Sequence, residues 1–483
     1  QQWEQTTDLK RDDYYATIPS LPISYASARP ILERLAGPNV PDGWQGALPF
    51  SYHVGPGPVE VSFSVAYDYK VRTIWNVMAT LKGSAEPDRW VMLGNHRDAW
   101  TYGAVDPSSG TSATLEACRA LGEAKKAGWT PRRTILYASW DAEEYGLVGS
   151  TEWAEEHEKE IGQKAVLMLN VDSAVSGPNL SADGIPSLRD LFLSAASDVT
   201  NPRTGKTLAD EWLEARRRAW ASEPVDLDAT VWSGRESAKP PFPEFQPQMN
   251  FLGSGSDYTA FVDHLGVPAL NVDFEGRYGV YHSIYDDYFW MEHFGDPEFL
   301  LHSTAGKLYA LIMMRAASSE VVPLTFTPYA QALREHVDDL RRSIARKERA
   351  SGKPFEFEGL DDLISAVRRF DEQAHSLDRE TANLAHRGDV DAATLQKAND
   401  ALTRVERQFL LKDGLPGRAW FKHSLYAPGL TTGYASWPLP AVRQAIEEND
   451  HKALEAAVQA LVPRIEAATE SMKTAQDASK LGD

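Results

Sequence analysis

The chain has 483 residues, of which 42% are hydrophobic; this length exceeds one compact core, so we expect two or three domains. Its net charge of −20 argues against the basic face that nucleic acid or an anionic membrane requires, so we expect no nucleic-acid partner. The single cysteine, Cys118, excludes an intramolecular disulfide and a cysteine metal cage, and its apolar helical setting predicts a buried thiol.

Residues 1–70 are rich in Pro, Gly and Tyr, with short strand-like runs such as VEVSFSVAY at 59–67. The chain opens without a methionine, so we expect a processed or truncated product that has lost its targeting segment. No run reaches the roughly 18 apolar residues of a membrane span. Asn179-Leu-Ser181 matches a glycosylation signal. We therefore expect an exported protein, either extracellular, periplasmic or tethered to a membrane through a missing N-terminus.

Residues 71–322 alternate apolar strands with helical segments. Strands are expected at 73–81, 89–96, 133–141 and 165–173, helices at 110–128 and 149–162, and a helix followed by a strand over 257–274. This alternation predicts an α/β domain whose mixed, mostly parallel sheet is flanked by helices. The polar, proline-rich residues 202–250 predict an excursion over the surface.

The pattern changes near residue 325, and residues 323–483 are expected to form a separate helical domain. Apolar residues follow helical spacing in two runs, which are Leu360, Leu363, Ile364, Val367 and Phe370, and then Leu395, Ala398, Leu402, Val405 and Phe409. This spacing predicts a bundle of antiparallel helices.

Acidic and histidine side chains follow four of the predicted strands. They are His96 and Asp106 after the second strand, Asp141, Glu143 and Glu144 after the third, Asp172 after the fourth, and His282 after the last. The carboxyl ends of parallel strands share one edge of a sheet, so these groups are expected to converge on one crevice. Two histidines with three carboxylates suit zinc, and such a set can hold two ions and still leave positions open.

The neighbouring residues have separate expected roles. In the pair Glu143-Glu144, one side chain can point to metal and the other to the attacking water as general base. Asp98, two residues beyond His96, is expected to accept the second N–H of that imidazole and so fix its tautomer. The bond between Asp106 and Pro107 is a candidate cis peptide.

Several long motifs resemble one known family. They include GNHRDAWTYGAVDPSSGTSATLEACRAL, GWTPRRTILYASWDAEEYGLVGSTEWAEE, LNVDSAVSG, LGSGSDYTAFVDHLG and YHSIYDDY, with GLPGRAWFKHSLYAPG in the helical part. Over nearly the whole chain, the sequence resembles glutamate carboxypeptidase II and its relatives, a branch of the di-zinc aminopeptidases that also includes the transferrin receptor. The resemblance implies a di-zinc exopeptidase fold, a peptide substrate, and a homodimer formed through the helical domain.

The resemblance also implies a role for each matching residue. His96, Asp106 and Asp172 match the ligands of one zinc, and Asp106, Glu144 and His282 match those of the other, so Asp106 would bridge the two ions. Glu143 matches the general base, while Ser254, Gly255, Tyr281 and Tyr434 match substrate-binding positions.

The sequence departs from the family where glutamate is recognised. A lysine-tyrosine pair that grips a C-terminal glutamate is matched here by Gly433-Tyr434, so only the tyrosine remains. The arginine patch of the family is matched by Ala182, Asn271 and Asp273. Replacing cations by neutral and acidic groups removes favourable pairing with acidic substrates, so we expect an exopeptidase that does not prefer glutamate. Trimming at a free amino end and release of a neutral or basic C-terminal residue both remain open.

The resemblance extends to two peripheral features. Residues 1–70 match only the later part of an apical, protease-associated insert, so either a partner N-terminal fragment supplies the earlier part or it has been cut away. Glu152 and Glu155 match half of a structural calcium site; the alternative is an acidic helix start facing solvent.

Two other functional classes compete with the exopeptidase. A catalytically inactive, receptor-like binding protein on the same scaffold should lack several metal ligands, whereas all five are present here together with Glu143. The other alternative is a di-zinc amidohydrolase that acts on small amides.

Overall fold

The protein is described here by a computed structural model. It describes residues 18–66, 70–222, 245, 247–352, 354–355, 357–386 and 390–480. The chain divides into two compact units, Gln1–Thr73 and Ile74–Asp483. In the first unit, the described residues form one helix, α2 (Tyr25–Leu32), and otherwise irregular chain. Within the described residues, none of the helices has both the length and the apolar character needed to cross a membrane.

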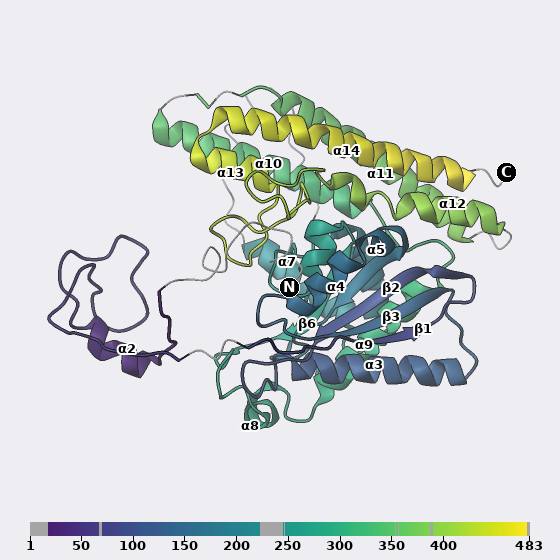
Figure 1. Cartoon of the computed structure of the whole chain (residues 1–483). Helices are drawn as coiled ribbons and strands as arrows, with labels where there is room; N and C mark the ends of the chain where they lie inside the picture. The colour runs from purple at the N-terminus through teal and green to yellow at the C-terminus, as the bar shows by residue number, and fades with distance from the viewer. Residues whose placement is uncertain are drawn as a thin grey trace. The chain divides into compact units, whose positions relative to one another are not determined.

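The second unit is built on a six-stranded sheet (Figure 1). The strands are β1 (Val77–Leu81), β2 (Glu86–His96), β3 (Arg133–Trp140), β4 (Ala165–Asn170), β5 (Asn179–Gly184) and β6 (Ala269–Glu275). Their order across the sheet is β1-β3-β2-β4-β6-β5. The four central strands run parallel, and the edge strands β1 and β5 are antiparallel to their neighbours. The expected mixed, mostly parallel sheet is therefore confirmed.

The apolar runs of the sequence account for the central strands. Every residue of β3 and β4 is buried, because helices cover both faces of a parallel sheet and leave no polar side. Helices α3 (Ser108–Lys126) and α9 (Leu300–Ser318) lie together on one face, while α4 (Val148–Glu156) and α5 (Glu158–Lys164) cover the other (Figure 1). The remaining helices of this part are α6 (Arg189–Ser197), α7 (Leu208–Ser222) and the short α8 (Tyr288–Trp290).

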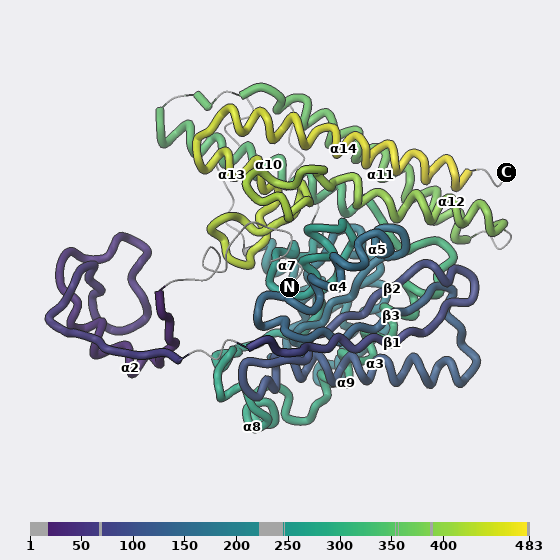
Figure 2. The backbone as a smooth tube through the Cα atoms, viewed as in Figure 1, coloured from purple at the N-terminus to yellow at the C-terminus, as the bar shows by residue number. Residues whose placement is uncertain are grey.

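The C-terminal part of the chain is helical, as expected. Its helices are α10 (Thr327–Ser351), α11 (Leu360–His386), α12 (Ala392–Leu402), α13 (Pro440–Glu448) and α14 (His451–Lys480). The long helices α11 and α14 lie along each other in the tube view, and α12 also contacts α14 (Figure 2). The predicted division at residues 322 and 323 falls between α9 and α10, inside the second compact unit.

Several local expectations were wrong. Residues 59–66 alternate like a strand but have no ladder partner in the structure, and a strand needs one. The helix predicted for 149–162 is interrupted at His157, whose Nδ1 hydrogen-bonds the carbonyl oxygen of Trp153 at 2.9 Å. Within the predicted surface excursion, Leu208–Ser222 forms helix α7; residues 223–244 lie outside the described residues, so the excursion itself stays a prediction.

The second run of helical spacing, 395–409, is also not one helix. α12 ends at Leu402, and a 3-10 turn spans Glu406–Phe409. At the break, the Thr403 hydroxyl donates back to the carbonyl oxygens of Asn399 and Asp400, at 2.9 and 3.1 Å. Such bonds compete with the continuing helix. Val405 and Phe409 are nevertheless fully buried. The apolar spacing therefore predicted which residues are buried, but not that the helix is interrupted.

Candidate functional site

The predicted site residues lie at one edge of the sheet, where the four parallel strands end. β2 ends at His96, β3 is followed by Glu143 and Glu144, and β4 is followed by Asp172. Buried groups tie these strand ends together: Asn95 Nδ2 donates to the carbonyl oxygen of Val171 at 2.8 Å. The packing is therefore tight at the point where the polar side chains emerge.

Helix α3 closes against the same edge. It begins at Ser108, directly after the cis peptide between Asp106 and Pro107. A Cβ atom at Gly110 would lie 2.0 Å from the carbonyl oxygen of Asp172, so only glycine allows this approach. The loop that carries Asp106 is thus pressed against the end of β4.

Two groups of candidate ligands result. In the first, His96 Nε2 lies 3.0 Å from Asp172 Oδ1 and 3.9 Å from Glu143 Oε2. In the second, His282 Nε2 lies 3.2 Å from Glu144 Oε2. Within each group, the candidate ligand atoms lie within 4.8 Å of one another. The first group is His96, Glu143 and Asp172, and the second is Asp106, Glu144 and His282.

Asp106 is a member of the second group and also lies close to the first. Its Oδ1 lies 3.4 Å from His96 Nε2, and its Oδ2 lies 3.1 Å from His282 Nε2. One carboxylate therefore turns one oxygen toward each histidine, which is the arrangement that a bridging ligand needs. The structure thus brings Asp106 close to the histidines of both groups, while Glu143 is a member of the first.

The site concentrates buried carboxylates around two histidines. Burial, reinforced by the charge of Asp172, raises the pKa of Glu143 to about 9, and burial next to Asp106 raises that of Glu144 to about 7. The carboxylates around His96 outweigh the effect of its burial and raise the pKa of that imidazole. Among the described residues, no lysine or arginine forms an ion pair with these carboxylates.

The residues fit a pair of divalent cations. Asp106 Oδ1 and Glu144 Oε1 are buried and have no hydrogen-bond partner, which is costly unless a cation takes that place. Imidazole nitrogen and carboxylate oxygen are common ligands of zinc. The unpaired oxygens and the donor set therefore agree on a metal site.

Asp98 supports the site in a different way from the one expected. His96 Nδ1 lies 3.1 Å from the backbone oxygen of Asp98 and 3.7 Å from its carboxylate, so the carbonyl is the partner of the imidazole. The carboxylate instead accepts the backbone N–H groups of Glu143 and Glu144, at 3.0 and 3.2 Å. Asp98 thereby fixes both the imidazole and the turn that carries the two glutamates.

The predicted substrate-binding residues come from separate elements and meet near the two groups. Tyr281 stacks on His282 with ring centroids 3.7 Å apart. Burial, with the nearby charges of Asp106 and Asp172, raises the pKa of Tyr281, so its hydroxyl remains a donor. The backbone N–H of Ser254 donates to the carbonyl oxygen of Tyr434 at 3.0 Å, which brings a loop of the helical domain to this edge.

Of the three positions expected to match an arginine patch, Ala182 is buried on β5, while Asn271 and Asp273 are half-buried on β6. Burial, reinforced by Glu275 and Asp183, raises the pKa of Asp273. Among the described residues, Asp273 forms no ion pair with a lysine or arginine that would hold it ionised. The position therefore offers no positive charge to an acidic substrate.

The structure does not assemble a calcium site from the two predicted residues. Glu152 and Glu155 are exposed on α4, and Glu155 accepts a hydrogen bond from Trp420 Nε1 at 2.6 Å. Among the described residues, neither belongs to a group of three candidate ligands. Both glutamates face solvent, as the alternative expects, but they do not lie at a helix start, because the first turn of α4 holds no acidic residue.

Two aspartates of the site were missed from the sequence. Asp286 is buried and binds the loop that carries Asp106, accepting the backbone N–H of Val105 at 2.8 Å. Asp257 is buried with both carboxylate oxygens unpartnered, and burial raises its pKa to about 7. Both lie in motifs that were recognised, but nothing in the pattern distinguishes them from capping residues such as Asp287.

Comparison with known proteins shows two domain families. Residues 76–214 match Peptidase family M28, and residues 358–473 match the transferrin receptor-like dimerisation domain. The probable glutamate carboxypeptidase LAMP1 of Arabidopsis thaliana is 38% identical over 432 residues, which cover 89% of this chain and 56% of that protein. The aminopeptidase NAALADL1 of Rattus norvegicus is 33% identical over 444 residues, which cover 88% of this chain and 56% of that protein.

The chain thus spans about half the length of the curated relatives that it matches. A zinc aminopeptidase from Bacillus subtilis also aligns in structure, with a TM-score of 0.33 and 19% identity, covering 51% of this chain and 50% of that one. The sequence matches therefore show a peptidase family M28 domain over residues 76–214 and a transferrin receptor-like dimerisation domain over residues 358–473.

Proposed function

We propose that this protein is a zinc-dependent exopeptidase that holds two zinc ions and hydrolyses peptide bonds of small peptides, with Glu143 as general base. The observation that carries the proposal is the position of Asp106, which presents one oxygen to each of two histidine-carboxylate groups. His96 and Asp172 would hold one ion, Glu144 and His282 the other, and Asp106 both.

A pair of divalent cations supplies Lewis acidity, which polarises the scissile carbonyl and makes a water more acidic. Glu143 accepts a proton from the attacking water as its oxygen bonds to the carbonyl carbon, and it returns the proton to the leaving amine nitrogen as the C–N bond breaks. The Tyr281 hydroxyl donates to the carbonyl oxygen as negative charge develops there. Since burial and the charge of Asp172 raise the pKa of Glu143, its action as a base requires positive charge nearby, which would lower that pKa.

We also propose that the enzyme does not prefer glutamate. Position 433 carries no side chain, and its glycine has a φ of +63° with open space around it. Neither Asn271 nor Asp273 supplies a cation on β6. Tyr434 remains as the exposed group that can contact a substrate end.

A Glu143→Gln variant tests the role of the base. Digestion of a peptide library with zinc present, read by mass spectrometry, should show stepwise loss of single residues from one end with the wild-type chain. The variant should bind the same amount of zinc but turn over about 10²–10⁴-fold more slowly. Glu156→Gln, which changes an exposed glutamate of α4, is the matched control and should retain activity.

The outcomes separate the competing functions. Wild-type protein that binds zinc but cleaves neither peptides nor small amides would favour the receptor-like binding protein. Cleavage of small amides without trimming of peptides would favour the amidohydrolase. Equal turnover by wild type and Glu143→Gln would contradict the role of Glu143. We further propose that residues 358–473 form a homodimer interface, and sedimentation showing only monomer at micromolar concentration would contradict it.

A further inference from the structure

We infer that Asp286 is a positioning residue that holds the Asp106 carboxylate against His282 and thereby sets up the second of the two metal sites. The inference rests on the proposed function, because it concerns the group formed by Asp106, Glu144 and His282. Asp286 contacts none of the reacting atoms. It acts through the two loops that deliver Asp106 and His282.

The first set of contacts reaches the loop of Asp106. The side chain of Asp286 is 2% exposed. Its Oδ1 accepts the backbone N–H of Val105 at 2.8 Å, and its Oδ2 accepts that of Asp106 at 3.2 Å. In addition, the backbone oxygen of Asp286 accepts the N–H of Ala104 at 3.1 Å. Three consecutive residues are thus held by one aspartate.

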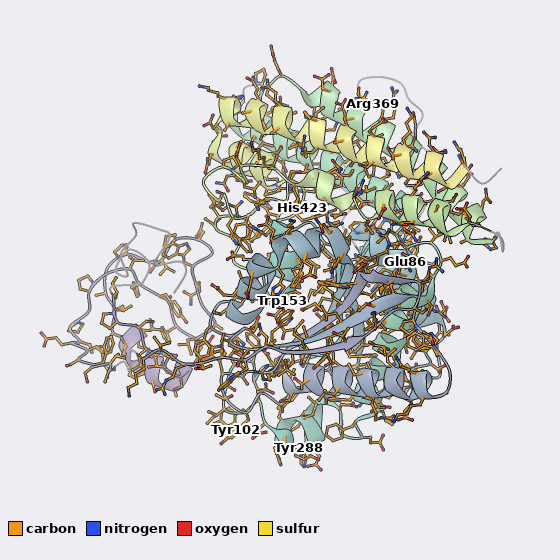
Figure 3. All side chains as sticks on the ribbon, turned by 45° about the vertical axis from the view of Figure 1, so that its right-hand side comes forward. Glu86, Tyr102, Trp153, Tyr288, Arg369 and His423 are labelled. Carbon is orange, nitrogen blue, oxygen red and sulfur yellow. The ribbon has the colours of Figure 1, made fainter. Side chains whose placement is uncertain are left out.

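The second set of contacts lies within the loop of His282. The Tyr278 hydroxyl donates to Asp286 Oδ2 at 2.7 Å, so one carboxylate bonds both loops. Thr101 Oγ1 adds a bond to the Ser283 carbonyl oxygen at 2.8 Å. Figure 3 shows Tyr102 and Tyr288, which flank these segments, next to each other, and both line one pocket.

The backbone of His282 explains why such support is needed. His282 has a φ of +52°, in the left-handed region that a non-glycine residue rarely adopts. Such a conformation persists only where the surrounding structure enforces it. His282 lies in the sequence between Tyr278 and Asp286, whose side chains are hydrogen-bonded to each other. This bond, with those from Asp286 to the Asp106 loop, can maintain the left-handed backbone of His282.

The first group of ligands is held by other contacts. His96 is fixed through its Nδ1 by the backbone of Asp98, and the segment of Asp172 is fixed by Asn95. His96 is the last residue of the central strand β2, and Asp172 lies just after the central strand β4. Neither residue lies on the loops that Asp286 connects. Since Asp106 would also contribute to the first site, loss of the Asp286 carboxylate should weaken the second metal site much more than the first.

Zinc titration against a competing chelator tests this asymmetry in Asp286→Asn. The asparagine side chain has an NH2 group in place of one carboxylate oxygen. It therefore cannot accept hydrogen bonds from Val105, Asp106 and Tyr278 all at once. We expect two tight zinc ions in wild type, and in the variant one tight ion and a second bound about 10–100-fold more weakly. Asp287→Asn is the matched control, because that neighbour only caps α8 and should leave both affinities unchanged.

Two further measurements keep the test decisive. Tyr278→Phe removes one donor to the carboxylate and should give a smaller loss at the same site, even if Asp286→Asn folds poorly. Hydrogen exchange at the amides of Val105 and Asp106 should be faster in Asp286→Asn than in Asp287→Asn without any metal. Equal zinc binding by both aspartate variants, or equal weakening of both sites, would overturn the inference. If wild type binds no zinc, the proposed function fails, and unchanged amide exchange would then separately refute the positioning role.

Discussion

Gly253→Ala should push the helical domain's loop away from the site. A Cβ atom at Gly253 would lie 1.8 Å from the carbonyl oxygen of Tyr434 and 2.6 Å from the backbone nitrogen of Ser436. Ordinary contact begins near 3.4 Å, so the two backbones must separate by roughly 1.5 Å. Because backbone atoms are involved on both sides, no side-chain rotation can relieve the clash.

The cost can be worked from this geometry. Overpacking of this kind costs about 1–3 kcal/mol, and loss of the hydrogen bond from Ser254 to Tyr434 adds about 1 kcal/mol. Since Tyr434 would move with its loop by more than 1 Å, turnover of a substrate that contacts it should fall by up to ~10²-fold. The zinc affinity should be unchanged, because none of the proposed ligands lies in either segment.

Thermal unfolding and kcat/KM of the purified variant measure both effects. Gly279→Ala is the control near the site, because a Cβ atom there has open space. Gly122→Ala, also with open space inside α3, should stabilise the protein by roughly 0.5–1 kcal/mol. If Gly253→Ala is as stable and as active as wild type, the segment of Gly253 does not approach the loop of Tyr434 so closely. The assignment of Tyr434 to the substrate site would then be wrong as well.

Two further predictions concern pH and metal. Burial lowers the pKa of His336 to about 3 from 6.5, so the unfolded state binds more protons between these values and stability is lost as pH falls through that window. When the pH is lowered from 7 to 4.5, the free energy of unfolding should fall by about 2–3 kcal/mol less in His336→Leu than in wild type. Urea unfolding at both pH values measures this, and an equal fall in the two proteins would contradict it. Zinc at a hundred times its Kd should stabilise the protein by about 2.7 kcal/mol per site, so a melting temperature that is the same with zinc and with chelator would argue against the metal centre.

The central sheet and the meeting of the ligands could be predicted from the sequence for one physical reason. A parallel strand covered on both faces is mostly apolar, so β3 and β4 are recognisable by the apolar runs at residues 135–138 and 165–169. Once the strands are parallel, the residues that follow them share one edge. His96 and Asp172 therefore converge without any knowledge of the loops.

The edge strand and the supporting contacts could not be predicted in this way. β5 is short and alternates exposed with buried residues in a sequence that contains Asn, Ser, Asp and Gly, so it has no apolar run. Asp286 and Asp287 are identical neighbours, yet one bonds the Asp106 loop and the other caps α8. Which aspartate faces inward depends on the path of the loop, and that path depends on contacts between segments about 180 residues apart.

The way the site is assembled separates its chemistry from its selectivity. The candidate ligands His96 and Asp172 follow buried central strands, where a displacement would disturb the core of the domain. Tyr434 and Gly433 lie on a loop of the helical domain, and Gly433 has open space around it. A side chain at position 433 would add only the strain of a positive φ, about 1–2 kcal/mol, without touching the ligands. Substitutions in this loop can therefore change how a substrate end is held while the proposed cation site stays intact.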